Sequence, residues 1–227
     1  PKSFFKWALG DTQVVPFARF NYDNPDTVKF SELIEHHGVK GLKLHNRPLY
    51  NARADYRIMD SPDWNAMYDL CARYGLPILW HLNQRYRDPA LVHGANTAET
   101  WRGLPYTNED VLAHFLGIAA RHPKTVFLLA HLNFLGNERL ARIFNLYPNV
   151  NMYCTHWQLR FGERLTDREI EAIRPFAIRY ADRIFFGTDF SFHVREKQND
   201  PVWWRNFYQA NIRFLKALEL PQEALDK

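Results

Sequence analysis

Short apolar runs alternate strictly with longer segments of helical periodicity along almost the whole chain. The 227 residues contain six such strand–helix units. Parallel strands need a crossover, usually a helix, to return to the same starting edge, so strict alternation predicts a parallel sheet with helices packed outside it. The predicted strands are 14–20, 39–45, 76–82, 125–132, 149–156 and 183–190, and the predicted helices are 26–38, 61–75, 107–123, 137–148, 166–182 and 201–220.

Local signals mark the ends of several predicted helices. Gly38 and Gly75 follow the last periodic residues of two helices, where a left-handed residue commonly ends a helix. Ser61 stands at an N-cap position, with Pro62 at the first helical position. Pro175 lies inside another helical pattern, which predicts a kink or a break there.

Ionisable residues stand at the carboxyl ends of five consecutive predicted strands. An open doubly wound sheet concentrates its site at one switch point, whereas a closed barrel collects residues from many strand ends. The pattern therefore favours an α/β fold of the (β/α)8 TIM-barrel type, whose first two units would lie before Pro1. The residues concerned are Lys43, His45, His81, His131, His156 and Asp189.

Two histidines and one aspartate in this set have the chemistry of metal ligands. His81, His131 and Asp189 end three different parallel strands, and strand alternation puts His131 on one face with Phe127 and Leu129. Imidazole nitrogens and carboxylate oxygens suit Zn²⁺ or a similar divalent ion. A single strand-end histidine is more often a hydrogen-bonded structural residue, and Asp189 alone could cap a turn, so the hypothesis depends on the three occurring together.

Four motifs, in their order along the chain, resemble the strands of the amidohydrolase superfamily. They are GVKGLKLH, GLPILWHL, FLLAHL and FFGTDF. The similarity is closest to the amidohydrolase-related (amidohydrolase 2) branch and runs from about Val14 to the carboxyl terminus. This branch contains hydrolases and non-oxidative decarboxylases of small organic acids, so the resemblance implies a barrel fold and one of these activities.

The resemblance also implies roles for single residues. His81 would bind the metal, expected to be zinc. His131 would bind a second metal or hydrogen-bond the reacting water and the substrate. Asp189 would bind the metal and take a proton from the water. Lys43 matches the position at which binuclear members carry a carbamylated lysine, although in single-metal members that position is not a ligand.

The sequence departs from the family pattern at its start. The family's first strand carries His-x-His, two further ligands, and no such motif occurs here. The chain is therefore expected to be a single barrel domain over residues 1–227 that is incomplete at both ends. Three functions stay open: hydrolysis of a small organic acid, lactone, ester or amide by a metal-activated water; metal-dependent decarboxylation of an aromatic or unsaturated acid; and metal-free binding on a degenerate barrel.

A long loop after the His81 strand is the candidate for substrate recognition. The segment 83–106 exceeds the usual length of such a connection. Arg85, Arg87 and Arg102 could clamp a carboxylate, with Lys43, His45 and His156 as further substrate-binding candidates. The alternative is a solvated loop with surface arginines. If the clamp is right, the substrate is a small anionic molecule.

Composition narrows the other partners. The net charge of +4 comes from scattered basic residues, which argues against nucleic acid. No apolar segment is long enough for a membrane span. Two cysteines give no disulfide framework, and a cytoplasmic enzyme is expected. The aromatic cluster at 203–208 predicts packing or a contact between subunits, which leaves a homo-oligomer open.

Overall fold

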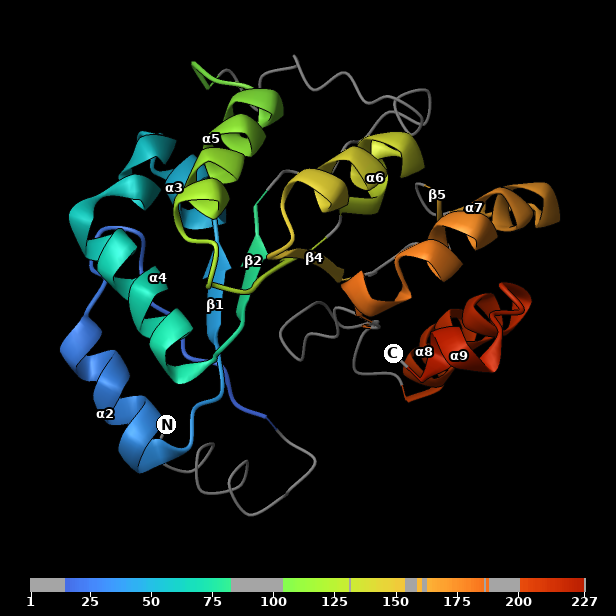
Figure 1. Cartoon of the computed structure of the whole chain (residues 1–227), viewed down its shortest axis with the longest axis horizontal. Coiled ribbons are helices and arrows are strands. Elements are labelled where there is room, and N and C mark those ends of the chain that lie inside the picture. The colour runs from blue at the N-terminus through green and yellow to red at the C-terminus, as the bar shows by residue number, and fades with distance from the viewer. Residues whose placement is uncertain are drawn as a thin grey trace. The chain divides into compact units, whose positions relative to one another are not determined.

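The computed structural model describes residues 15–82, 104–130, 132–153, 159–160, 163–185, 187 and 201–226 (Figure 1). The chain divides into two compact units. Unit 1 comprises Pro1–Gln84, Thr97–Leu129 and Tyr147–Val150. Unit 2 comprises Arg85–Asn96, Ala130–Leu146 and Asn151–Lys227.

The strands of unit 1 are parallel, as the alternation predicts. They are β1 (Leu42–His45), β2 (Ile78–His81) and β3 (Phe127–Ala130), the last residue of which belongs to unit 2. In the register, Leu42 is the partner of Ile78, and Ile78 is the partner of Phe127. The main-chain N–H of Phe127 also donates to Asn149 O, 2.9 Å away.

The strand predicted at 14–20 is reduced to a single parallel bridge. Ala18 pairs with Leu42, and the N–H of Ala18 donates to Gly41 O at 2.9 Å. Pro16 accepts a hydrogen bond from the N–H of Lys40 but has no N–H of its own to return. A proline therefore interrupts the ladder where the strand was expected to begin.

The helices of unit 1 begin and end largely where the sequence signals predict. Gly38 and Gly75 take left-handed conformations, with φ of 65° and 63°, directly after two of them. The Ser61 hydroxyl accepts from the N–H of Trp64, with Pro62 in the first turn. The elements are α2 (Thr27–His37), α3 (Arg47–Asn51), the 3-10 helix η1 (Tyr56–Asp60), α4 (Pro62–Tyr74) and α5 (Asn108–Arg121), which starts with a Thr107–Asp110 capping box.

An aromatic cluster fills the space between α4, α5 and one face of the strands. Tyr68 of α4 lies 5.8 Å from Phe127 between ring centroids, in an edge-to-face arrangement. Phe115 of α5 meets Trp80 at 5.4 Å and Phe127 at 5.2 Å, also edge to face. All four side chains are buried. Edge-to-face pairs add to the stability that burial of their apolar area provides, so this cluster fixes the strands against their helices.

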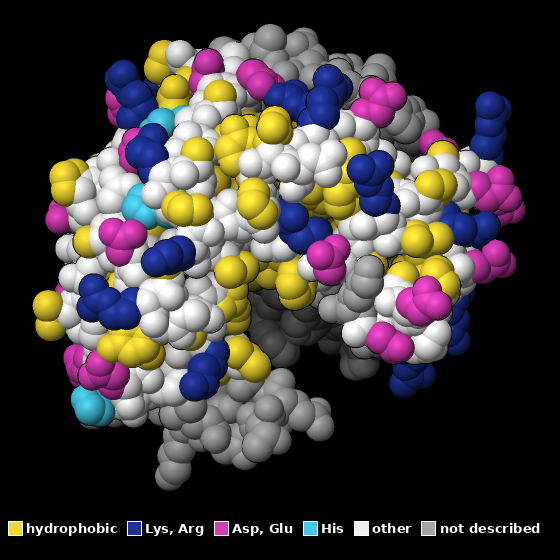
Figure 2. All heavy atoms as spheres, in the orientation of Figure 1, with side chains coloured by type: hydrophobic (Ala, Val, Ile, Leu, Met, Phe, Trp, Pro, Cys, Tyr) yellow, Lys and Arg dark blue, Asp and Glu magenta, His cyan; other side chains and the backbone are white. Residues whose placement is uncertain are grey.

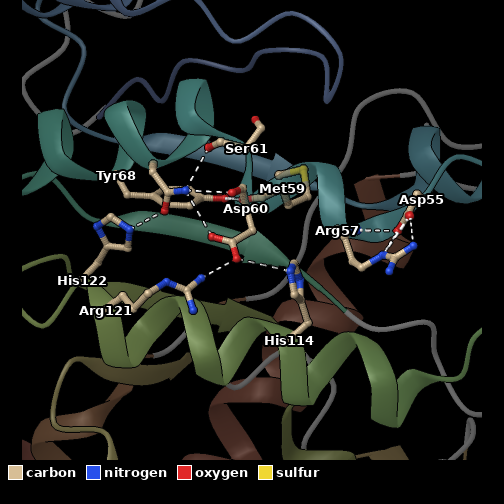
Figure 3. Close-up of polar contacts among 10 residues, drawn as sticks. Asp55, Arg57, Met59, Asp60, Ser61, Tyr68, His114, Arg121 and His122 are labelled. Atoms are coloured by element: carbon tan, nitrogen blue, oxygen red, sulfur yellow. Dashed lines mark hydrogen bonds and ion pairs between the residues drawn. The ribbon is translucent and has the colours of Figure 1, made fainter.

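A polar cluster joins the same two helices near the surface (Figure 3). Asp60 accepts a hydrogen bond from Arg121 and lies 3.7 Å from Nε2 of His114. Asn65 donates through Nδ2 to the carbonyl oxygens of Asp60 and Ser61, at 2.8 and 2.9 Å. Partial burial raises the pKa of Asp60, but the hydrogen bonds from Arg121 and Asn65 outweigh it and leave that pKa below its ordinary value.

Unit 2 contains its own parallel strand pair and an aromatic core. Met152 of β4 (Val150–Tyr153) is the partner of Ile184 of β7 (Ile184–Phe185). Phe144, Phe176 and Tyr180 contact one another at centroid distances of 5.0 to 6.0 Å. The other elements are η4 (Leu132–Leu135), α6 (Asn137–Leu146), the antiparallel pair β5 (Leu159–Arg160) and β6 (Glu163–Arg164), α7 (Asp167–Arg179), η5 (Ala181–Arg183), α8 (Pro201–Ala217) and α9 (Gln222–Leu225).

Pro175 does not split its helix. The helix α7 runs continuously from Asp167 to Arg179 with Pro175 inside it. Pro175 and Glu171, whose carbonyl loses its usual N–H partner, are both exposed. Water can therefore satisfy the freed carbonyl, and the helix tolerates the proline on its outer side.

Candidate functional site

Alternate residues of β1, β2 and β3 point away from α4 and α5. Their neighbours on the other side, including Leu42, Ile78 and Trp80, are almost completely buried. The residues that point away are only half-buried, and two of them are histidines at strand ends. This surface, the His81 face, consists of Lys43, His45, Leu79, His81 and Leu128. The sheet therefore brings three candidate site residues, Lys43, His45 and His81, to one face.

His45 and His81 form a stacked pair on this face. They are direct partners in the register of β1 and β2, and their ring centroids lie 4.1 Å apart with only 14° between the planes. Ring nitrogens direct their lone pairs within the ring plane, so two parallel rings do not aim at one ion between them. The pair suits one metal ligand beside one hydrogen-bonding group.

The main chain constrains the proton positions of His45. Its Nδ1 accepts a hydrogen bond from the N–H of Arg47 at 2.9 Å. A nitrogen that accepts carries no proton, so the neutral ring has its proton on Nε2. Nε2 is then a donor, which suits contact with a carbonyl or carboxylate oxygen of a substrate better than contact with a metal.

An aromatic ring lies beside the amino-terminal end of the His81 face. A Cβ atom built on Gly41 would lie 2.3 Å from Cε1 of Phe17 and 2.7 Å from its Cζ. Gly41 precedes β1 by one residue, and strand alternation puts it on the same side as Lys43. Phe17 therefore occupies the space that a side chain at position 41 would need. An isolated glycine in a strand pattern is a signal of such close approach, and the sequence reasoning did not use it.

In β3, Phe127 and Leu129 share one face, as predicted, and the register shows which face this is. In the register, Leu79 is the partner of Leu128, whereas Trp80 is the partner of Leu129. Phe127 and Leu129 consequently face the helices and not the side of His81. His131 follows Ala130, where β3 ends, so strand alternation gives no direction for its side chain.

In unit 2 a tyrosine approaches the start of the GTDF motif. A Cβ atom built on Gly187 would lie 1.7 Å from Cζ of Tyr153 and 2.1 Å from its hydroxyl oxygen. No residue other than glycine fits at position 187 beside Tyr153 in this arrangement. Tyr153 therefore lies beside Gly187, which stands two residues before the predicted proton acceptor Asp189 in the sequence. Tyr153 was not among the residues predicted from the sequence.

The remaining predicted site residues lie outside the described part of the chain. They are Arg85, Arg87, Arg102, His131, His156 and Asp189. Among described residues, no group of three or more His, Cys, Asp or Glu side chains could hold a metal ion. His81 offers one imidazole, and a catalytic zinc site uses three protein ligands. The described residues thus fit part of such a site, and its completion by His131 and Asp189 stays a prediction.

Two surface properties bear on other partners. On the face shown in Figure 2, lysine and arginine side chains are interspersed with aspartate and glutamate. Among the described residues, no helix combines the length and the apolar character that crossing a membrane requires. The interspersed charges on the face in Figure 2 form no broad basic surface of the kind that binds nucleic acid.

Comparison with known proteins places the chain in a family. The profile of the family described as "Amidohydrolase" matches residues 11–227. No curated protein sequence matches the chain.

Solved structures show the same fold. An uncharacterized TIM-barrel protein from Bordetella bronchiseptica is 14% identical, with a TM-score of 0.62, over 100% of this chain and 67% of that chain. A 5-carboxyvanillate decarboxylase from Sphingomonas paucimobilis is 11% identical, with a TM-score of 0.60, over 98% and 66%. An amidohydrolase from Burkholderia multivorans with bound zinc is 12% identical, with a TM-score of 0.60, over 99% and 74%. The chain thus has the TIM-barrel fold that the ionisable residues at the strand ends favoured, and it spans about two thirds of the first two proteins.

Proposed function

Because the chain belongs to the amidohydrolase family, we propose that it is a metal-dependent hydrolase that cleaves a lactone, ester or amide bond in a small anionic molecule. The observation that carries this proposal is the His81 face. Lys43, His45 and His81 meet on one side of adjacent parallel strands, at or near their carboxyl ends, where TIM-barrel enzymes place their sites.

The metal ligands in this proposal are His81, His131 and Asp189, and the metal is zinc. The ion supplies the positive charge that polarises a carbonyl oxygen and acidifies a nearby water. The Asp189 carboxylate accepts the proton that this water loses. The zinc bound in the amidohydrolase from Burkholderia multivorans supports the choice of metal.

The other residues bind and orient the substrate. The Nε2–H of His45 donates to a substrate oxygen. The hydrogen bond that Nδ1 accepts from Arg47 supports this role, because it leaves Nε2 as the donor. The Lys43 ammonium draws an anionic group toward the same face. Arg85, Arg87 and Arg102 hold a carboxylate, and His156 contributes a further hydrogen bond. Together these groups favour a substrate that carries a carboxylate beside the reacting carbonyl.

Decarboxylation of an aromatic or unsaturated acid is the second candidate. The fold similarity to a 5-carboxyvanillate decarboxylase supports it, and the same metal and basic residues would bind the carboxylate that leaves as carbon dioxide. A hydrolase consumes water and releases two fragments or opens a ring, whereas a decarboxylase releases carbon dioxide. The two reactions are therefore separated by their products.

The test uses the purified full-length protein. Its metal content is measured by mass spectrometry, and it is assayed with carboxylated lactones, esters and amides and, in parallel, for carbon dioxide release from aromatic acids. The proposal expects stoichiometric zinc, with bond cleavage that a chelator removes and zinc restores. Carbon dioxide release without bond hydrolysis would move the assignment to the decarboxylase. A folded protein that binds no metal and turns over no substrate would support the metal-free binding protein instead.

A further inference from the structure

A buried hydrogen-bond network connects the carboxyl ends of β1 and β2. Asn46 follows His45 directly and is 2% exposed. Its main-chain N–H donates to His81 O at 3.1 Å. Its Oδ1 accepts the indole N–H of Trp80 at 2.8 Å, and its Nδ2 donates to the hydroxyl oxygen of Tyr50 at 3.4 Å. One asparagine thereby contacts the strand of His81 through both its main chain and its side chain.

Tyr50 completes the network one helical turn later. It lies in α3 and is buried. Its hydroxyl donates to the carbonyl oxygen of Leu82. We call the contacts of Asn46 and Tyr50 with residues 80–82 the strand-end clamp. The clamp holds the side chain before His81, the carbonyl of His81 itself and the carbonyl after it.

The clamp restricts how the His81 backbone can move. Trp80 is fixed on the helix side by its indole bond and by aromatic contacts. Any rotation or shift of the His81 peptide would break buried hydrogen bonds, and buried polar groups without partners are costly. A metal ligand depends on this control, because ligand distances tolerate only a few tenths of an ångström.

Two other tyrosines of unit 1 also donate to main-chain carbonyls, but their acceptors do not lie beside His81. The Tyr68 hydroxyl donates to Met59 O at 2.6 Å, and the Tyr106 hydroxyl donates to Ala54 O at 3.1 Å. Both acceptors lie in the segment between α3 and α4. Tyr50 makes the same kind of bond, but its acceptor is the residue next to His81.

We propose that Asn46 and Tyr50 are positioning residues that set the direction and depth of His81 for metal binding. This inference rests on the proposed function, because it gives the clamp a purpose only if His81 binds a metal. The structural alternative is that the network merely satisfies buried polar groups. The two differ in whether loss of a clamp bond affects the metal site more than loss of an equivalent bond elsewhere.

The test compares Tyr50→Phe with Tyr68→Phe in the full-length protein. Each variant keeps its ring and loses one buried hydroxyl that donates to a main-chain carbonyl, and in Tyr50→Phe the Nδ2 of Asn46 also loses its acceptor. Zinc affinity is measured by competition with a chromophoric chelator, and thermal unfolding is followed on the metal-free protein. Loss of groups that orient metal ligands typically weakens binding about 10–100-fold. We expect Tyr50→Phe to weaken zinc binding about 10-fold, and Tyr68→Phe to change it by less than about 3-fold.

The outcomes decide between positioning and a structural role. A loss of zinc affinity in Tyr50→Phe that is absent from Tyr68→Phe supports positioning. Equal effects of the two variants on zinc affinity would overturn it, and so would unchanged affinity in Tyr50→Phe.

Amide hydrogen exchange of the metal-free protein keeps the test independent of the proposed function. Positioning predicts faster exchange in the peptide that covers residues 78–82 for Tyr50→Phe and not for Tyr68→Phe. If the unmodified protein binds no zinc, the proposed function fails by that result. Exchange alone then decides whether the clamp holds the backbone of His81, and equal exchange in both variants refutes it.

Discussion

On one face of β1, β2 and β3 the side chains are apolar and buried, whereas on the other they are half-buried and include a lysine and two histidines. Trp80 and His81 are adjacent in β2, but Trp80 is buried among Tyr68, Phe115 and Phe127, whereas His81 is half-buried and stacked on His45. On the helix side, tight aromatic packing holds the sheet to α4 and α5. On the other side, Lys43 carries an amine, and His45 and His81 carry imidazole groups.

One strand can thus pack one set of residues into the core and present polar side chains with the other. Because successive side chains alternate between faces, a strand can be fixed from one side and leave the other side to polar groups. The rigidity of the helix side also benefits the His81 face, since Trp80 donates into the strand-end clamp. Substitutions at Trp80 and His81 should therefore differ mainly in how much stability they cost.

The largest effects are expected from substituting Trp80 and His81 one at a time. Trp80→Ala should lower the free energy of unfolding by about 3–5 kcal/mol, because it leaves a cavity in the aromatic cluster. His81→Ala should lower it by about 1 kcal/mol or less, yet weaken zinc binding by more than about 100-fold, since it removes a ligand. Chemical denaturation and chelator competition measure the two quantities. Similar losses of stability in both variants would contradict the separation of the faces.

Much of this arrangement could be predicted from the sequence because its signals are local. The alternation of apolar runs with helical segments predicts parallel strands. Ser61, Gly38 and Gly75 predict helix ends, since each of these residues acts on its own neighbours in the chain. Lys43 and His45 are two residues apart in one strand, so their common face follows from periodicity alone.

Features that depend on register could not be predicted in this way. Which side of β3 faces His81 is decided by the pairing of Leu79 with Leu128, and that pairing has no local sequence signal. The clamp likewise joins Asn46 to Trp80 across two strands. The short helix α3, five residues long, has too few turns to show a helical period, although it carries Tyr50.

A second prediction asks whether the chemistry of the His81 face extends to Asp189. Asp189→Asn keeps the shape of the side chain but removes its charge and basicity. If Asp189 is the proton acceptor, kcat should fall by at least about 100-fold, because general-base catalysis contributes about 10²–10⁴-fold. If Asp189 only caps a turn, stability should fall by about 0.5–2 kcal/mol with turnover unchanged. Turnover, zinc content and thermal unfolding of one preparation distinguish the two.

A third prediction concerns the close contact beside the His81 face. Gly41→Ala should destabilise the protein by about 1–3 kcal/mol, because the new methyl group overlaps the ring of Phe17 and forces a shift. Gly117→Ala in α5 is the matched control. Its nearest atom would be the Arg121 guanidinium at 3.6 Å, an ordinary contact, so alanine should stabilise the helix by about 0.5–1 kcal/mol. Destabilisation of equal size in both variants, measured by urea unfolding, would refute the contact.

The smallest effect is expected on the helix side, where the polar cluster gives stability a dependence on pH. The side chain of His114 is 19% exposed, beside Asp60 and edge-on to the ring of Tyr56. Burial lowers the pKa of His114 below its ordinary value, and Arg121 lowers it further, while Asp60 opposes the shift. The folded protein therefore binds this proton less readily than the unfolded chain does.

The sign of the pH effect follows from that difference. A group whose folded pKa is lowered contributes its full stability above its unfolded pKa, about 6.5 for histidine, and this contribution is lost as the pH falls toward the folded pKa. The free energy of unfolding should thus decrease below about pH 6.5. Asp60 acts in the same direction at lower pH, because its pKa also lies below its ordinary value. His114→Gln should flatten the first decrease, measured by urea unfolding between about pH 5 and 7. His36→Gln, at an exposed position of α2, is the control and should keep it. If both variants retain the full slope, the acid sensitivity comes from groups outside this cluster. The polar contacts in Figure 3 would then contribute little to the pH dependence of the free energy of unfolding.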